Sequence, residues 1–156
     1  MKLRNLKPSD YTAISPLIDE WWGGRKMSHL LPKLFFDHFN DTSFIVEKDG
    51  DIIGFLIGFL SQTSSDKAYI HFVGVDPKYR KFNVGRQLYN TFFDQVKQND
   101  RHSVHCITSP VNKTSIAFHL KMGFLIEGGD KEIDGVYVHS DYDSPAEDRV
   151  LFMKRI

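Results

Sequence analysis

Two apolar runs meet at Asp49-Gly50, and this junction constrains the fold more than any other segment of the chain. The runs are FIVEK before the junction and DIIGFLIGFL after it. An Asp-Gly pair readily adopts the positive φ angles of a tight hairpin turn, and β-branched and aromatic residues favour extended strands. The segment therefore predicts two strands joined by a hairpin.

The rest of the chain alternates between apolar strands and amphipathic helices. Strand signals lie at residues 3–6, 68–75, 103–108, 124–127 and 150–154, and helical periodicity at residues 10–22, 30–39, 83–98 and 113–121. Residues 127–149 are acidic and punctuated by glycine and proline, which indicates a long loop. This order predicts the α/β class, with a mixed sheet that carries helices on its faces.

Length and composition narrow the classes of protein. A chain of 156 residues is expected to form a single domain, residues 1–156. Its 20 basic and 20 acidic residues cancel, so no overall field favours nucleic acid or a membrane surface. The longest apolar run, Ile52–Leu60, is too short to span a bilayer, and the N-terminus lacks the apolar core of a signal peptide. A cytoplasmic protein is expected.

Cysteine and histidine form no metal-binding pattern. Cys106 is the only cysteine, which excludes an intramolecular disulfide, and no His-Glu-x-x-His motif is present. His102 and His105 are three residues apart on a predicted strand, so their side chains point to opposite faces. No metal site is expected.

The stretch VDPKYRKFNVGRQLY passes from a strand into a helix. Pro77 ends the strand because it has no N–H to donate, and the first N–H groups of the next helix attract anions. Three cations lie at this helix start: Arg80, Lys81 and Arg86. Gly85 leaves room for a ligand at the backbone. A phosphate or pyrophosphate site and a plain turn with solvated cations fit these residues about equally well.

The same stretch resembles the acetyl-CoA signature of the GNAT N-acetyltransferase superfamily, Val-x-Pro-x-Tyr-Arg and then Arg/Gln-x-x-Gly-x-Gly/Ala before a helix. Residues 112–124, NKTSIAFHLKMGF, are similar to the family block Asn-x-x-Ala-x-x-Phe-Tyr-x-Lys-x-Gly-Phe. The order of elements also resembles that family along essentially the whole chain. Two positions depart from it: Asn83 replaces the first glycine, although asparagine tolerates left-handed angles, and His119 replaces tyrosine.

The resemblance implies a GNAT-like acyl-CoA N-acyltransferase fold, with a central, mostly antiparallel sheet flanked by about four helices. It also implies transfer of an acetyl group from acetyl-CoA to a primary amine of a small molecule or peptide by direct attack. One alternative is a non-catalytic acetyl-CoA or CoA-binding sensor or regulatory module, and another is a nucleotide-phosphate binder. The sequence does not specify the identity of the acceptor or whether the protein forms a homodimer.

The resemblance assigns a cofactor-binding set. It comprises Val73, Val75, Arg80, Lys81, Asn83, Val84, Gly85, Arg86, Asn112, Ser115 and Phe118. Asn112 fits a plain helix cap equally well.

Two histidines are the catalytic candidates. His119 takes the position of the family's tyrosine, so the resemblance implies that it protonates the departing thiolate; a histidine without function is the alternative. Strict alternation along residues 68–75 puts His71 on one face with Val73 and Val75, which makes it a candidate general base. A satisfied core histidine is the alternative for His71.

The acceptor site is expected between the first two helices. Trp21 and Trp22 would form an aromatic wall and Arg25 an anion clamp. Tyr142, in the long loop, would belong to a lid over the same pocket. The alternatives are that the tryptophans pack the core and that the loop makes a dimer contact.

Overall fold

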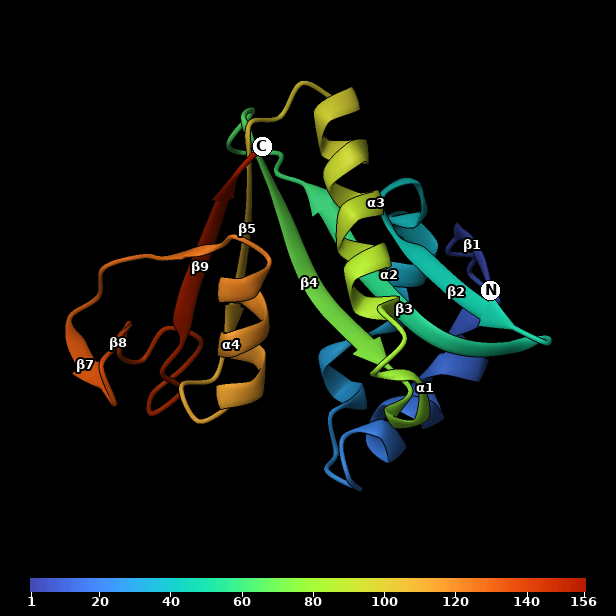
Figure 1. Ribbon diagram of the computed structural model, residues 1–156, viewed down its shortest axis with the longest axis horizontal. Coiled ribbons are helices and arrows are strands. Elements are labelled where there is room, and N and C mark those ends of the chain that lie inside the picture. The colour runs from blue at the N-terminus through green and yellow to red at the C-terminus, as the bar shows by residue number, and fades with distance from the viewer.

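A seven-stranded sheet forms the centre of the structure, a computed structural model that describes all of residues 1–156 (Figure 1). Its strands are β1 (Lys2–Asn5), β2 (Phe44–Lys48), β3 (Asp51–Leu60), β4 (Lys67–Val75), β5 (Ser103–Thr108), β6 (Leu125–Ile126) and β9 (Val150–Arg155). They lie in the order β1-β2-β3-β4-β5-β9-β6. Neighbouring strands are antiparallel except β4 and β5, which are parallel.

Four helices cover the sheet. They are α1 (Asp10–Trp21), α2 (Lys33–His38), α3 (Val84–Gln98) and α4 (Lys113–Lys121). One core of 20 buried residues lies between the sheet and α3 and α4, and a second core of 10 lies between the sheet and α1 and α2. The predicted mixed, mostly antiparallel sheet with about four helices is confirmed. No helix combines the length and the apolar character that a membrane crossing requires.

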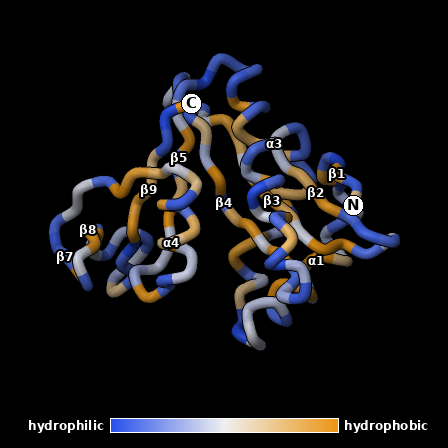
Figure 2. The backbone as a smooth tube through the Cα atoms, in the orientation of Figure 1, coloured by the Kyte–Doolittle hydropathy of each residue, from blue (hydrophilic) through white to orange (hydrophobic).

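The apolar face of α3 explains a glycine in β3. Leu88, Phe92 and Val96 recur at helical spacing and are fully buried against the sheet. The ring of Phe92 occupies the space where a Cβ on Gly58 would lie. Figure 2 shows the resulting pattern, with hydrophobic inner strands and hydrophilic outer loops.

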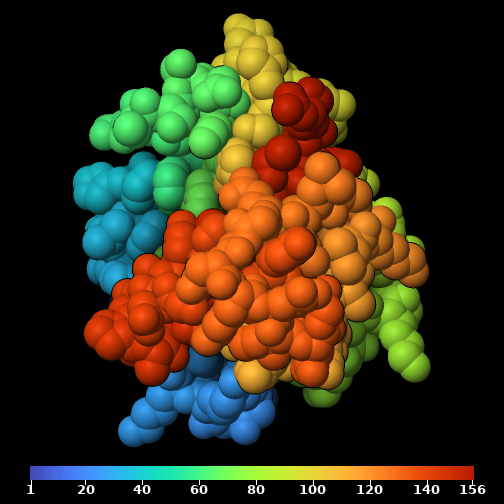
Figure 3. All heavy atoms as spheres, turned by 90° about the vertical axis from the view of Figure 1, so that its left-hand side faces the viewer, coloured from blue at the N-terminus to red at the C-terminus, as the bar shows by residue number.

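The predicted hairpin at Asp49-Gly50 is present, and a second Asp-Gly pair forms a hairpin that was not predicted. Asp49 and Gly50 have φ angles of 52° and 83° at the turn between β2 and β3. Residues 127–149 were predicted as loop, but they contain a second hairpin, β7 (Lys131–Ile133) and β8 (Val136–Val138). Its turn is Asp134-Gly135, with φ angles of 51° and 80°. The flanking strands are too short to give a visible alternation. In Figure 3 this segment (orange to red) covers one side of the molecule.

The predicted second helix is divided in the structure. A 3₁₀ turn, Ser28–Leu30, precedes Pro32, and α2 begins only at Lys33. Proline lacks the N–H that a continuous helix would need at this position, so the helix starts directly after it.

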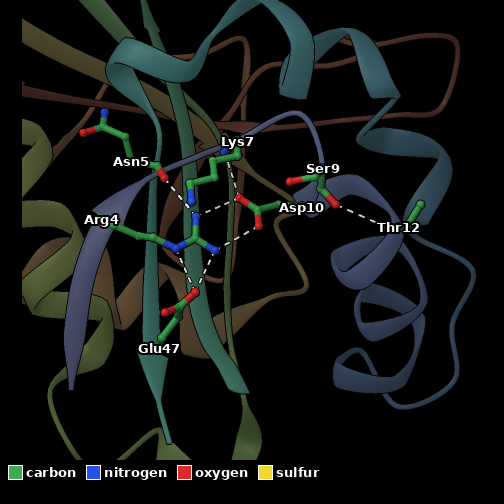
Figure 4. A network of polar contacts seen from close by, with 7 residues as sticks. All are labelled: Arg4, Asn5, Lys7, Ser9, Asp10, Thr12 and Glu47. Atoms are coloured by element: carbon green, nitrogen blue, oxygen red, sulfur yellow. Dashed lines mark hydrogen bonds and ion pairs between the residues drawn. The ribbon is translucent and has the colours of Figure 1, made fainter. Parts of the chain in front are cut away.

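A network of charges ties the N-terminal strand to α1 and β2 (Figure 4). The guanidinium of Arg4 donates to both oxygens of Asp10 (2.9 Å each) and to Glu47 (2.7 Å). Asp10 also accepts the backbone N–H of Lys7 at 2.7 Å. Burial by itself raises the pKa of Asp10, but the bonds from Arg4 and Lys7 outweigh it and hold the pKa below its usual value.

We expect Asp10→Asn to lower the free energy of unfolding by about 2 kcal/mol at pH 7, because Arg4 loses a charged partner. A carboxyl whose pKa falls on folding stabilises the protein above the unfolded pKa, here 3.8, and this contribution is lost as pH falls through the folded value. The difference between variant and wild type in urea denaturation should therefore shrink below pH 4 or so. Asp37→Asn, in an exposed pair with Lys33, is the control and should cost less than about 0.5 kcal/mol.

Candidate active site

The parallel strands β4 and β5 part to form an open wedge. They pair only through Lys67–Tyr69 and Ser103–His105. Beyond Tyr69, β4 continues to Val75 with β3 on one side and no strand on the other. The backbone N–H and C=O groups on that open side are free to bind a ligand that carries amide groups. In Figure 1 the wedge lies between α3 and α4.

The start of α3 opens onto the same end of β4. Asn83 precedes the helix in the left-handed conformation, with φ 60°, and no side chain caps the first N–H groups. Lys81 and Arg86 are exposed here and form no ion pair. Free donors, the helix dipole and two unpaired cations together give this helix start the chemistry to attract an anion.

Arg80, the third cation at this helix start, is hydrogen-bonded to α1. Its Nη2 donates to the Trp21 carbonyl at 3.2 Å, at the C-terminal end of α1. The predicted anion site is thereby linked to the helix that precedes the predicted acceptor segment.

Three of the predicted cofactor residues meet beside the wedge. A Cβ built on Gly85 would lie 3.5 Å from Phe118 and 3.9 Å from Val75, which is ordinary contact. Val73 packs against the same core as Val75 and Phe118, so these side chains share the α3 face of the sheet. Asn112 caps α4, where its side chain accepts the N–H of Ser115 at 3.1 Å.

His119 lies inside the core, with both ring nitrogens bonded within the protein. Its Nδ1–H donates to the Ser115 carbonyl at 2.7 Å, since a carbonyl can only accept, and its Nε2 accepts from the Tyr89 hydroxyl at 2.8 Å. The ring stacks on Phe152 at 4.6 Å. Burial lowers the pKa of His119, so the imidazole is neutral. This geometry supports a packing role better than the predicted proton donation.

His71 does not share a face with Val73 and Val75, and the predicted alternation is wrong here. Ile70 pairs with Gly58 and Phe72 with the adjacent Ile57, so His71 is the extra residue of a β-bulge. The bulge turns His71 toward α2, where its ring stacks on Phe35 at 4.2 Å.

The hydrogen bonding of His71 leaves one nitrogen available. Its Nε2–H donates to the Leu30 carbonyl at 2.6 Å, and no protein group bonds to Nδ1. Burial lowers the pKa of His71 despite this bond, so Nδ1 carries a lone pair at neutral pH.

The two tryptophans have different surroundings. Trp21 is buried and stacks on Phe55 at 5.9 Å, which makes it a core residue. Trp22 is half-buried and packs on Phe72 at 5.1 Å. Arg25 is exposed, and no side-chain contact fixes it. Of the predicted acceptor residues in this segment, Trp22 therefore lies nearest to β4.

A cavity of about 270 Å³ adjoins the closed end of the wedge. Aromatic side chains form much of its wall: Phe59, Tyr69, Tyr142 and Phe152. Tyr142 was predicted from the long loop, but other polar residues of the cavity were not: Ser61, Lys67, Tyr69, His105 and Glu127. Tyr69 and His105 are register partners on β4 and β5, a relation that no local pattern reveals.

His105 connects two polar neighbours at the cavity. Its Nδ1 lies 3.5 Å from Glu127 Oε1, and its Nε2 lies 2.9 Å from the Ser103 hydroxyl. Burial lowers its pKa, and the nearby Glu127 carboxylate partly opposes this. The alternation of Ser103, His105 and Ile107 on one face of a strand was the available sequence signal.

Comparison with known protein families shows to which family this chain belongs. The acetyltransferase (GNAT) family matches residues 9–124, which include the wedge, the start of α3 and all of α4. The chain belongs to the GNAT acetyltransferase family. The predicted family is thereby confirmed, and Asn83, which departs from its signature, adopts left-handed angles.

Two curated relatives are L-2,4-diaminobutyric acid acetyltransferases. The relative from Nocardia farcinica is 33% identical over 79 residues, which are 51% of this chain and 41% of the relative. The relative from Shouchella clausii is 32% identical over 87 residues, or 55% and 48% of the two chains. This GNAT chain thus matches slightly less than half the length of either relative.

Solved structures share the fold along nearly the whole chain. Ard1 from Thermoplasma volcanium superposes with a TM-score of 0.80 and 20% identity, covering 99% of this chain and 97% of its own. Diaminobutyrate acetyltransferase EctA from Paenibacillus lautus, in complex with L-2,4-diaminobutyric acid and coenzyme A, superposes with a TM-score of 0.72 and 22% identity over 97% and 92% of the chains. These similarities establish the fold.

We expect His119→Phe to keep the stacking on Phe152 but to leave the Tyr89 hydroxyl without its buried partner. The free energy of unfolding should fall by about 2 kcal/mol in urea denaturation. Turnover per folded molecule should stay near that of the wild type. A folded variant with unchanged acetyl-CoA affinity and at least roughly tenfold slower turnover would instead support proton donation by His119.

Proposed function

We propose that the protein is an N-acetyltransferase that moves the acetyl group of acetyl-CoA to a primary amine of a small molecule by direct attack. The observation that carries this proposal is the wedge between β4 and β5, which opens beside the uncapped start of α3. Membership of the GNAT family and the names of the curated relatives support it.

The anion site at α3 suits the pyrophosphate of acetyl-CoA. The N–H groups of Val84, Gly85 and Arg86 are in the first turn of the helix, and Lys81 supplies a further charge. The open edge of β4 offers donors and acceptors for the amide groups of the pantetheine arm, while Val73 and Phe118 supply apolar contact. The thioester would then lie in the wedge.

The chemistry needs a neutral amine, whereas a lysine-like ammonium has a pKa of about 10.4. In the proposed step the amine nitrogen attacks the thioester carbon, so that a C–N bond forms, the C–S bond breaks and the thiolate leaves. His71 is the proposed base, because its Nδ1 is neutral and has no partner in the protein. The proton lost by the amine goes to Nδ1 directly or through water, and the thiolate takes a proton from solvent.

Substitutions at Gly85 test the proposed cofactor site. Gly85→Glu should weaken acetyl-CoA binding on the order of a hundredfold in isothermal titration calorimetry, because it places a carboxylate against the pyrophosphate. Gly85→Ala adds only a methyl group with ordinary contacts and should cause a smaller loss. ATP serves as the control ligand for the wild type. Equal acetyl-CoA affinity of all three proteins would reject this site.

The pH dependence of activity tests His71 as the base. The pKa of His71 lies below 6.5, so its neutral form prevails at pH 7 and activity should fall only as pH drops through the lowered value. His71→Gln should slow turnover by about a hundredfold and remove this acidic limb from the pH profile. Retention of the same limb in the variant would assign it to another group.

Acceptor-dependent release of thiol separates an enzyme from a CoA-binding sensor. A sensor would bind acetyl-CoA and release thiol at the same slow rate with and without amines. An amine-dependent increase in thiol release is the outcome that this proposal requires.

A further inference from the structure

The cavity beside Tyr69 carries opposite charges within one small volume. Lys67 lines it and has no carboxylate within ion-pair distance. Glu127 lines it too, and its only partner is His105, which lies 3.5 Å from Oε1. The second carboxylate oxygen of Glu127 and the ammonium of Lys67 are therefore free to bind a ligand with complementary charges.

Aromatic rings add a preference for a cation. The rings of Tyr69 and Tyr142 line the cavity, and Tyr69 stacks on Phe59 at 5.4 Å. An ammonium group over such rings gains cation–π attraction in addition to its pairing with a carboxylate. Burial and the nearby Tyr142 keep the Tyr69 hydroxyl neutral by raising its pKa, so this hydroxyl can donate to a ligand.

The size of the cavity limits its occupant. With a volume of about 270 Å³, it holds roughly nine waters at about 30 Å³ each. A molecule with a similar number of non-hydrogen atoms fits, which is the size of a small amino acid.

The distance from the cavity to His71 determines how long the side chain of a bound amino acid must be. Tyr69 is the last residue of β4 that pairs with β5, and His71 lies two residues farther along. His71 is the bulged residue between Ile70 and Phe72, which pair with adjacent residues of β3, so it lies between one and two steps of about 3.3 Å beyond Tyr69, roughly 3–7 Å. Carbon–carbon bonds of about 1.5 Å let a short side chain of two to four methylene groups cover most of that distance.

We propose that Lys67 binds the α-carboxylate and Glu127 the α-ammonium of the acceptor, which is a small α-amino acid with a second, terminal amine. The head of the amino acid occupies the cavity, and its terminal amine extends into the wedge toward His71. This inference rests on the proposed function and goes beyond it by naming the groups that are recognised.

Three acceptors allow the proposed contacts of Lys67 and Glu127 to be tested separately. L-2,4-diaminobutyrate carries both head groups, 4-aminobutanoate lacks the α-ammonium, and 1,3-diaminopropane lacks the carboxylate. Thiol release from acetyl-CoA gives kcat/KM for each. Lys67→Met should lower this value about tenfold to hundredfold for the two carboxylates and leave 1,3-diaminopropane unchanged. Glu127→Gln should cause a similar loss for the two compounds with a second ammonium and leave 4-aminobutanoate unchanged.

Matched controls test the charge changes themselves. Lys97→Met and Glu132→Gln make the same substitutions at exposed positions away from the cavity and should leave all three values unchanged. Equal losses for all three acceptors in the Lys67 and Glu127 variants would overturn the inference, because a structural role predicts that result. Equal kcat/KM of the wild type for all three acceptors would also overturn it.

Failure of the inference and failure of the proposed function give different results. Acetylation of peptide N-termini without acetylation of the three small acceptors would reject the amino-acid subsite and the small-molecule acceptor, but not acetyl transfer from acetyl-CoA to an amine. Absence of acetyl-CoA binding in calorimetry, together with no thiol release for any amine, would reject both.

Discussion

Pairing between β4 and β5 stops after Lys67–Tyr69 and Ser103–His105, and the geometry of the site depends on this short contact. The two parallel strands are joined firmly enough to share one sheet, yet most of β4 keeps one open edge. Its other edge is held by β3 up to Val75, so the open edge is presented by a rigid strand. A longer β4–β5 ladder would satisfy the same backbone groups internally and leave none for a ligand.

The wedge separates two chemically different faces. On the α3 side lie the uncapped helix start with its cations and apolar side chains such as Val75 and Phe118, where we propose that the cofactor binds. On the other side lie His71, Trp22 and Tyr142, together with the charged cavity. An acetyl donor and an amine substrate that approach from opposite faces can meet in the wedge without competing for the same protein groups.

Hydrogen bonding, rather than residue type, distinguishes the two candidate histidines. Both are neutral because burial lowers their pKa. His119 has a hydrogen-bond partner at each ring nitrogen, so its polar atoms are satisfied inside an apolar core. His71 has a partner only at Nε2, which fixes its tautomer and leaves a lone pair on Nδ1. A proton acceptor requires that free lone pair.

The sequence by itself determined the features that depend on residues close together along the chain. Asp49-Gly50 specified a hairpin and helical spacing specified α3, since turn angles and amphipathic faces are local properties. Only the tertiary structure decided the rest. The bulge at His71 arises from register with β3, and the cavity joins β4 to segments some 40–80 residues away, so no local pattern encodes either. Packing of distant segments sets which polar groups are satisfied internally and which remain free to bind a ligand.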